Sequence, residues 1–206
     1  MRESSLKSKK VIVFDLDGTI VRLTADWMSL KELLVLKYQK IYKETCDFKS
    51  ISACLSEIVK RGDEKVLKNF FDIIRHYELK NIEDNEPIEE IIFFINNKEL
   101  FGVKEDAKLA VLSLNTRETI IKSLELANIS NKIDLIIGRE DVRKWKPDPE
   151  GLLKTQEYFK IKKEDMIYFG DLEKDIFTGK NATIETYLID DLIQLINKMK
   201  KELKKD

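Results

Sequence analysis

The chain has 206 residues, 36% of them charged, and its 37 lysines and arginines nearly cancel its 38 aspartates and glutamates. This balance gives no basic excess of the kind that binds nucleic acid or an acidic membrane surface. The longest apolar run, residues 91–95, is far shorter than the roughly 18 residues that a membrane span needs. We therefore expect a cytoplasmic protein with a small partner, and neither nucleic acid nor a membrane; the oligomeric state stays open.

The first predicted element is a short buried strand. Residues 11–14 read VIVF, a β-branched apolar run of the kind found in strands covered on both faces. From about residue 24 to residue 97 the pattern is helical, and it predicts four helices in succession, at residues 26–42, 50–62, 63–79 and 87–97. Asp26 is a plausible cap for the first of them, and Pro87 suits the first turn of the last.

After Gly102, apolar runs and helical patterns alternate. The predicted strands are residues 108–114, 134–138, 165–170 and 185–189, and the predicted helices are residues 116–128, 148–159, 173–182 and 190–203. Such alternation builds a parallel sheet with right-handed crossovers. With the first strand, the sheet has five strands, and the four-helix stretch is an insertion after strand one.

Polar side chains follow several of the predicted strands. Asp15 and Asp17 follow the first, Ser113 ends the second, Asp171 ends the fourth, and Asp175 comes four residues later. In open parallel sheets, ligands bind beyond the carboxyl ends of the strands. Carboxylates gathered at one edge would repel each other unless a cation is bound, and hard divalent cations prefer oxygen ligands. The pattern therefore predicts a Mg²⁺ site.

Two further residues indicate a phosphoryl group beside the metal. The Ser113 hydroxyl and Lys146, in the loop after the third strand, supply a donor and a cation at the same edge. A transferring phosphoryl group needs both, because its charge lies on oxygens that must be held. An aspartate can itself attack phosphorus, and a second acid can move the protons. Asp15 and Asp17 can divide those two roles.

Together these residues form a recognisable set. DLDGT at 15–19, Ser113, Lys146 in WKPDP, and GDLEKD at 170–175 resemble, in order, the four motifs of the haloacid dehalogenase-like hydrolase superfamily. The resemblance covers nearly the whole chain, and it extends to phosphoglycolate phosphatases with a helical cap. It implies a Rossmann-like α/β core at residues 1–19 and 97–206, with residues 20–96 as the inserted cap.

The resemblance also implies a role for each motif residue. Asp15 is then the nucleophile and Asp17 the general acid and base, while Ser113 and Lys146 hold the phosphoryl group. Mg²⁺ is expected on Asp15, the backbone carbonyl of Asp17 and Asp171. Asp175 supports the metal or Lys146 from behind. Because the superfamily's dehalogenases lack an acid at the position of Asp17, a phosphatase acting on a small phosphate monoester is expected.

Two positions depart from the pattern of close relatives. Arg22 and its neighbours stand where phosphoglycolate phosphatases often continue DGTLVDS, and Arg22 suits either a substrate anion or a surface pair with a glutamate of the cap. Leu114 follows Ser113 where many relatives have asparagine, and Asn115 comes next. Arg22 and Asn115 are therefore possible substrate contacts.

Cys46 and Cys54 lie eight residues apart and match no metal-binding spacing. Unpaired thiols in a reducing compartment are expected, with no role in the chemistry.

Two other functions compete with a phosphatase. A phosphomutase of the same superfamily would keep the phosphoryl group on the enzyme for a second substrate. A signalling receiver domain also uses an aspartyl-phosphate, Mg²⁺, a hydroxyl and a lysine, but its phosphoacceptor follows the third strand, whereas Asp15 follows the first. A phosphorylated signalling or binding module is thus the alternative from a different class.

Overall fold

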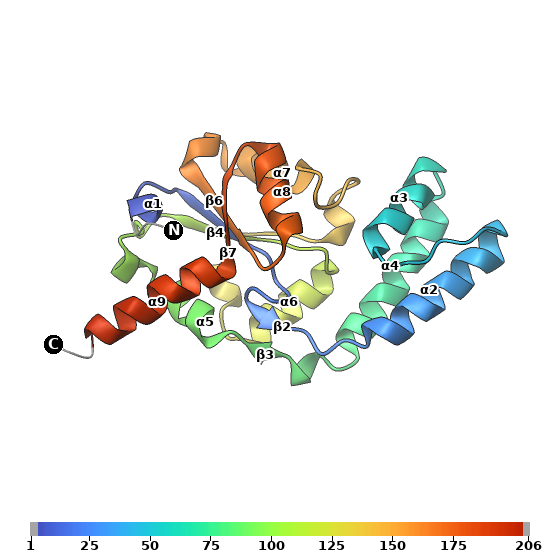
Figure 1. Cartoon of the computed structure of the whole chain (residues 1–206), viewed down its shortest axis with the longest axis horizontal. Coiled ribbons are helices and arrows are strands. Elements are labelled where there is room, and N and C mark those ends of the chain that lie inside the picture. The colour runs from blue at the N-terminus through green and yellow to red at the C-terminus, as the bar shows by residue number, and fades with distance from the viewer. Residues whose placement is uncertain (1–3, 204–206) are drawn as a thin grey trace.

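A computed structural model describes residues 4–203 and contains the predicted parallel sheet (Figure 1). Its five strands lie in the order β5-β4-β1-β6-β7. The strands are β1 Val11–Phe14, β4 Lys108–Leu112, β5 Leu135–Ile137, β6 Met166–Gly170 and β7 Glu185–Leu188. The predicted α/β class and the predicted strand count are confirmed.

Strand β1 lies at the centre of the sheet. It pairs in parallel with β4 on one side and β6 on the other, with Val11 opposite Lys108 and Met166. All four residues of β1 are buried. This burial explains their continuous apolar run, since helices cover both faces of the sheet. The residue that follows β1 is therefore delivered to the middle of the carboxyl edge.

Two helical layers enclose the sheet (Figure 1). Ile12 and Phe14 of β1 point to one layer, where they share a buried cluster with α5, α6 and α9, while Val11 and Val13 point to the other, with α7 and α8. The bounds are α5 Glu89–Asn96, α6 Arg117–Leu126, α7 Glu150–Phe159, α8 Glu173–Ala182 and α9 Ile189–Leu203. Alternate residues of β1 thus anchor both faces of the core.

Three helices form an arm that stands to one side of the sheet (Figure 1). They are α2 Trp27–Tyr42, α3 Ile51–Lys60 and α4 Glu64–Leu79, and we refer to residues 27–79 as the insert. Asp26 and Asp63 cap α2 and α4 by accepting hydrogen bonds from Ser29 N and Val66 N. The insert has its own apolar centre, in which the rings of Phe48 and Phe70 stack with centroids 5.8 Å apart.

The fourth predicted helix of this stretch differs from the expectation. Pro87 does not open it: β3, Glu86–Pro87, pairs antiparallel with β2, Val21–Arg22, and α5 begins two residues after Pro87. Proline has no N–H to donate, and a two-residue ribbon tolerates it because such a strand has free edges. Helix α5 packs against α9 and shares the core cluster with β1. The division of the chain at residues 20 and 96 stays a prediction.

The two cysteines also differ from the expectation of free thiols. Cys46 and Cys54 form a disulfide, with Cα atoms 6.0 Å apart, and the described part of the chain has no free cysteine. The loop after α2 turns back on itself through residues with positive φ, Lys43 and Phe48, before α3 begins. This reversal brings Cys46 against Cys54 in α3.

The remaining elements are short. Helix α1 spans Ser4–Lys7, and single 3₁₀ turns cover Ile82–Asp84, Lys98–Phe101, Ser130–Lys132, Arg139–Asp141 and Lys163–Asp165. Within residues 4–203 no helix combines the length and the apolar character that crossing a membrane requires.

Candidate active site

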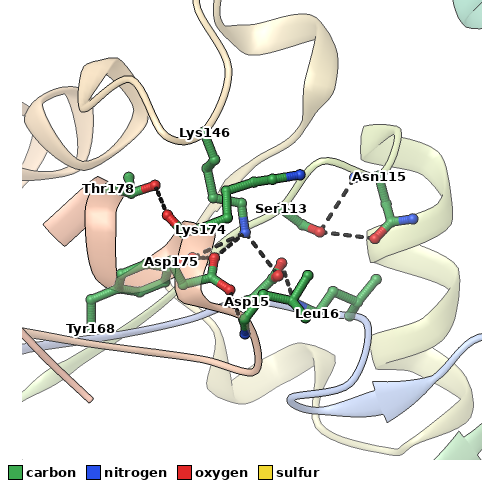
Figure 2. Close-up of polar contacts among 10 residues, drawn as sticks. Asp15, Leu16, Ser113, Asn115, Lys146, Tyr168, Lys174, Asp175 and Thr178 are labelled. Atoms are coloured by element: carbon green, nitrogen blue, oxygen red, sulfur yellow. Dashed lines mark hydrogen bonds and ion pairs between the residues drawn. The ribbon is translucent and has the colours of Figure 1, made fainter. Parts of the chain in front are cut away.

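The carboxyl edge of the sheet gathers most of the predicted site residues (Figure 2). Asp15 directly follows β1, Ser113 follows β4, and Asp171 follows β6. These three strands are neighbours in the order β4-β1-β6. Lys146 arrives from the loop between β5 and α7, and Asp175 from the first turn of α8. Parallel topology brings these strand ends together, so Asp15 and Asp175 meet at this edge although they lie 160 positions apart in the sequence.

Lys146 joins two of the carboxylates. Its Nζ lies 2.8 Å from Asp15 Oδ2 and 2.7 Å from Asp175 Oδ1, and it donates to the Tyr168 hydroxyl at 3.0 Å. The Tyr168 hydroxyl in turn donates to Asp175 Oδ1 at 2.6 Å. All four residues are buried, and only 5% of Lys146 is exposed. An ammonium has three protons, so these contacts use all of its donors.

Burial and charge act against each other in this group. Burial raises the pKa of Asp15, and the charge of Lys146 opposes that rise. Burial would also raise the pKa of Asp175, but the charge and hydrogen bonds of Lys146 and Tyr168 outweigh it and lower the pKa. Burial would lower the pKa of Lys146, yet the two carboxylates raise it. Lys146 therefore stays an ammonium, held between two carboxylates.

Local backbone geometry fixes the carboxylates. The N–H of Leu16 donates to Asp15 Oδ1 at 2.7 Å, and the N–H of Leu172 donates to Asp175 Oδ2 at 3.1 Å. Gly18 has a φ of 74°, and a Cβ at this position would overlap the Asp171 carboxylate. The glycine of the DLDGT motif is thus needed both for its left-handed backbone and for the close approach of Asp171.

The carboxylates supply a donor set that fits a divalent cation. Asp15, Asp171 and Asp175 each offer one carboxylate oxygen, and these oxygens lie within 4.8 Å of one another. Burial, followed by the charges of Asp15 and Asp175, raises the pKa of Asp171 to about 6. One ammonium does not balance three carboxylates, and oxygen ligands of this kind suit Mg²⁺. The sequence predicted Asp15, the Asp17 backbone carbonyl and Asp171 as ligands, with Asp175 supporting the metal or Lys146. The cluster brings Asp15, Asp171 and Asp175 together, and the ligand roles stay predictions.

Asp17 comes two residues after Asp15, in the segment between β1 and β2. Its Oδ1 accepts a hydrogen bond of 3.0 Å from the N–H of Leu23, just after β2. Burial raises the pKa of Asp17 to about 6, and the charges of Asp15 and Glu78 act in the same direction. Asp17 therefore holds a proton far more readily than an exposed aspartate does.

Ser113 and Asn115 belong to a separate hydrogen-bond chain (Figure 2). The Ser113 hydroxyl donates to Asn115 Oδ1 at 2.8 Å, and Asn115 Nδ2 donates to Glu78 Oε1 at 3.0 Å. Glu78 lies on α4 of the insert. Sequence reasoning missed it, although a signal existed: the buried stripe Leu67, Phe70 and Ile74 continues at helical spacing onto this glutamate.

Arg22 is not brought into this group. It is exposed on β2 and stands opposite Glu86 in the β2–β3 register. Among the residues that the structure describes, its side chain makes no hydrogen bond and no ion pair with Glu86 or any other residue.

Comparison with known proteins agrees with this geometry. The profile of the haloacid dehalogenase-like hydrolases matches residues 12–189. A phosphoglycolate phosphatase of Aquifex aeolicus is 30% identical over 185 residues, which cover 87% of this chain and 84% of the relative. A pyrophosphatase PpaX of Halalkalibacterium halodurans is 29% identical over 180 residues, covering 86% and 82%.

Solved structures share the fold. A crystal structure from Haemophilus somnus, described as a predicted phosphoglycolate phosphatase, superposes with a TM-score of 0.58 at 17% identity and covers 88% of both chains. At that identity the likeness concerns the fold alone. The profile match and the sequence relatives carry the assignment: the chain belongs to the haloacid dehalogenase-like hydrolases, and its sequence relatives include phosphatases.

Proposed function

We propose that this hydrolase is a Mg²⁺-dependent phosphatase that hydrolyses a small phosphate monoester through an aspartyl-phosphate on Asp15. The observation that carries the proposal is the position of Asp15: it directly follows the central strand β1 and contacts Lys146. Asp17 comes two residues later, and Ser113 follows the neighbouring strand β4. A nucleophile, a proton carrier, a cation and a hydroxyl donor thus meet at one sheet edge.

In the first step, a carboxylate oxygen of Asp15 attacks phosphorus and the bond from phosphorus to the ester oxygen breaks. The departing oxygen takes the proton of Asp17. A pKa of about 6 leaves part of Asp17 protonated near neutral pH, which suits a general acid. Asp15 then carries the phosphoryl group as an acyl phosphate.

In the second step, water attacks the phosphorus of the aspartyl-phosphate. Asp17, now a carboxylate, takes a proton from that water, the bond between phosphorus and the Asp15 oxygen breaks, and inorganic phosphate leaves. Both carboxyl groups return to their starting states, so one ester and one water are consumed in each cycle.

The charge of the phosphoryl oxygens needs partners throughout. Lys146 and the Ser113 hydroxyl lie at this sheet edge, and to hold these oxygens Lys146 exchanges one of its three acceptors and Ser113 turns its proton away from Asn115 Oδ1. Asp175 with Tyr168 keeps Lys146 oriented. Mg²⁺, held by Asp15, Asp171 and the Asp17 carbonyl with Asp175 close by, would supply additional positive charge for the transferring group.

The test is phosphate release from a panel of compounds, with Mg²⁺ and with a chelator. The relatives' names put 2-phosphoglycolate and inorganic pyrophosphate first in the panel, followed by sugar phosphates and nucleoside monophosphates. Wild type should release phosphate only with Mg²⁺, and Asp15→Asn should lose this activity.

Asp106→Asn is the matched control, because Asp106 is exposed and precedes β4, at the opposite end of the strands. It should keep full activity. Equal release by wild type and Asp15→Asn would contradict the proposal. Release that requires a bisphosphate activator would favour a phosphomutase instead.

A further inference from the structure

Glu78 is a buried carboxylate that the proposed chemistry does not use. It lies in the last turn of α4, on the insert, and only 1% of it is exposed. Its Oε2 accepts from the N–H of Thr116 at 2.9 Å and lies 2.7 Å from the Thr116 hydroxyl and 2.8 Å from the Thr119 hydroxyl. These partners lie at the amino end of α6 in the core, where a negative charge is favoured.

The other carboxylate oxygen reaches toward the active site. Glu78 Oε1 accepts from Asn115 Nδ2 at 3.0 Å, and the Ser113 hydroxyl donates to Asn115 Oδ1 at 2.8 Å. A carboxylate only accepts hydrogen bonds, so it requires the amide nitrogen of Asn115 to face it. The amide oxygen must then face Ser113, and the serine proton points to that oxygen.

The main chain of Asn115 is fixed from the core side. Its carbonyl accepts a hydrogen bond of 2.8 Å from the N–H of Arg139, at the end of β5, and its own N–H donates to Ser113 Oγ at 3.3 Å. Only the side-chain orientation remains to be set, and within the described residues Glu78 is the partner of the amide nitrogen. Glu78 of the insert therefore determines that the amide oxygen of Asn115, and not its amide nitrogen, faces Ser113.

A buried positive charge attracts Glu78. The Arg139 guanidinium is buried, and its Nε and Nη1 atoms have no hydrogen-bond partner in the described structure. Burial lowers the pKa of Arg139, while the negative charge of Glu78 acts in the opposite direction. The Glu78 carboxylate therefore interacts with a buried cation as well as with the amino end of α6.

We propose that Glu78 is a positioning residue that acts through Asn115 on the Ser113 hydroxyl, so that the insert sets the orientation of the phosphate-holding side of the site. The inference rests on the proposed role of Ser113. This role of the insert is the same for every substrate, because Glu78 contacts Asn115 and not the substrate.

The first test is a double-mutant cycle on metal-dependent phosphate release. Glu78→Gln keeps the size of the side chain and removes its charge. In the wild-type background it should lower kcat/KM on the order of 10- to 100-fold, as expected for a misplaced catalytic group. In a Ser113→Ala background the same change should cost less than about threefold, because the group through which Glu78 acts is gone.

Asn115→Ala gives a second route to the same result. It breaks the chain and leaves the contacts of Glu78 with Thr116 and Thr119 in place, so it serves if Glu78→Gln does not fold. The matched control is Glu118→Gln, which removes another α4–α6 contact, the 3.3 Å pair with Arg75, without touching the chain to Ser113. The control should keep wild-type kcat/KM. Equal losses with and without Ser113 would show a purely structural role and overturn the proposal.

A second readout does not depend on activity. In ¹⁵N-labelled protein, the side-chain amide signal of Asn115 can be assigned by its absence from Asn115→Ala. Loss of a charge-assisted hydrogen bond should move this signal in Glu78→Gln but not in Glu118→Gln. An unmoved signal in Glu78→Gln would refute the contact itself. A moved signal in a protein that releases no phosphate would instead place the failure in the proposed function.

Discussion

The two sides of the candidate site are built differently. On the Lys146 side, the ammonium and all of its hydrogen-bond partners, Asp15, Asp175 and Tyr168, come from the core. On the Ser113 side, the hydrogen-bond chain ends on Glu78, which belongs to the insert. A single sheet edge thus combines a charged half built within the core with a half whose hydrogen-bond chain is completed by the insert.

The insert touches the loop that carries Lys146 through an exposed ion pair, Arg143 Nη1 to Glu64 Oε2 at 2.9 Å, and through an apolar contact. Phe71 of α4 meets the ring of Trp145 edge to face, with centroids 6.2 Å apart. Trp145 precedes Lys146 and donates its indole N–H to the Arg139 carbonyl at 2.9 Å. Neither contact reaches Lys146 itself, whereas Glu78 accepts a hydrogen bond from Asn115, the partner of Ser113.

The largest effect is expected from Lys146→Met. It removes the cation and leaves Asp15 and Asp175 buried without a positive partner. We expect loss of nearly all phosphate release, and a lower free energy of unfolding by about 3–5 kcal/mol at neutral pH in urea. Lys180→Met, at an exposed position of α8, is the control and should change neither quantity. A fully active, fully stable Lys146→Met protein would show that Lys146 does not hold Asp15 and Asp175 in place.

Metal binding should depend on pH with a defined sign. The pKa values of Asp17 and Asp171 are about 6 in the folded protein, above the value of about 4 expected when the chain is unfolded. Folding therefore favours protonation, so these groups stabilise the metal-free protein below pH about 4, and that contribution is lost as the pH rises through about 6.

Mg²⁺ binds the deprotonated carboxylates, so its stabilising effect should increase as the pH rises. The rise in Tm on adding Mg²⁺ should be small at pH 5 and large above pH 7, where saturation at about 100 times Kd contributes about 2.7 kcal/mol. Thermal melts with Mg²⁺ or chelator across this range measure it. Asp171→Asn should weaken the rise, and a rise of equal size at every pH would contradict the assigned metal site.

A smaller effect is expected at Gly18. Gly18→Ala places a Cβ against the Asp171 carboxylate at a backbone φ of 74°. Gly62→Ala is a close match, because its φ is 71° and no atom lies within 4 Å of the added Cβ. The left-handed backbone of each alanine should cost about 1–2 kcal/mol in unfolding experiments. Only Gly18→Ala should also weaken the Mg²⁺-induced rise in Tm; equal behaviour of the two variants would remove Asp171 from the metal site.

The smallest effect is expected at Phe71. Phe71→Leu keeps an apolar side chain beside Trp145 but loses the ring contact, which is worth about 0.5–1.5 kcal/mol. We expect a loss of stability within that range by urea unfolding and a kcat/KM within about twofold of wild type. A loss of activity as large as that of Glu78→Gln would mean that the insert also organises the Lys146 half.

The site residues predicted from the sequence are those that directly follow a predicted strand. Asp15, Ser113 and Asp171 each follow an apolar strand, and parallel topology brings adjacent strand ends together whatever the details of packing. The start of α2 was predicted for a similar reason, because Asp26 caps its own helix. Such features depend on a few consecutive residues.

The parts that sequence reasoning missed depend on tertiary contacts. Tyr168 lies in a strand that reads as fully apolar, and its hydroxyl gains a role only because α8 brings Asp175 above it. Glu78 meets Asn115 only when α4 docks on α6. Pro87 follows a helix-start pattern, but pairing with Val21 in the β2–β3 ribbon determines its place.

Trapping the phosphoryl group on the protein shows whether Asp15 carries it. Asp17→Asn should still be phosphorylated by radiolabelled acetyl phosphate with Mg²⁺, because this leaving group needs no proton, but it should be slow to hydrolyse the product. We predict label that persists on Asp17→Asn and is absent from the double variant Asp15→Asn/Asp17→Asn. Equal labelling of the two proteins would contradict the account.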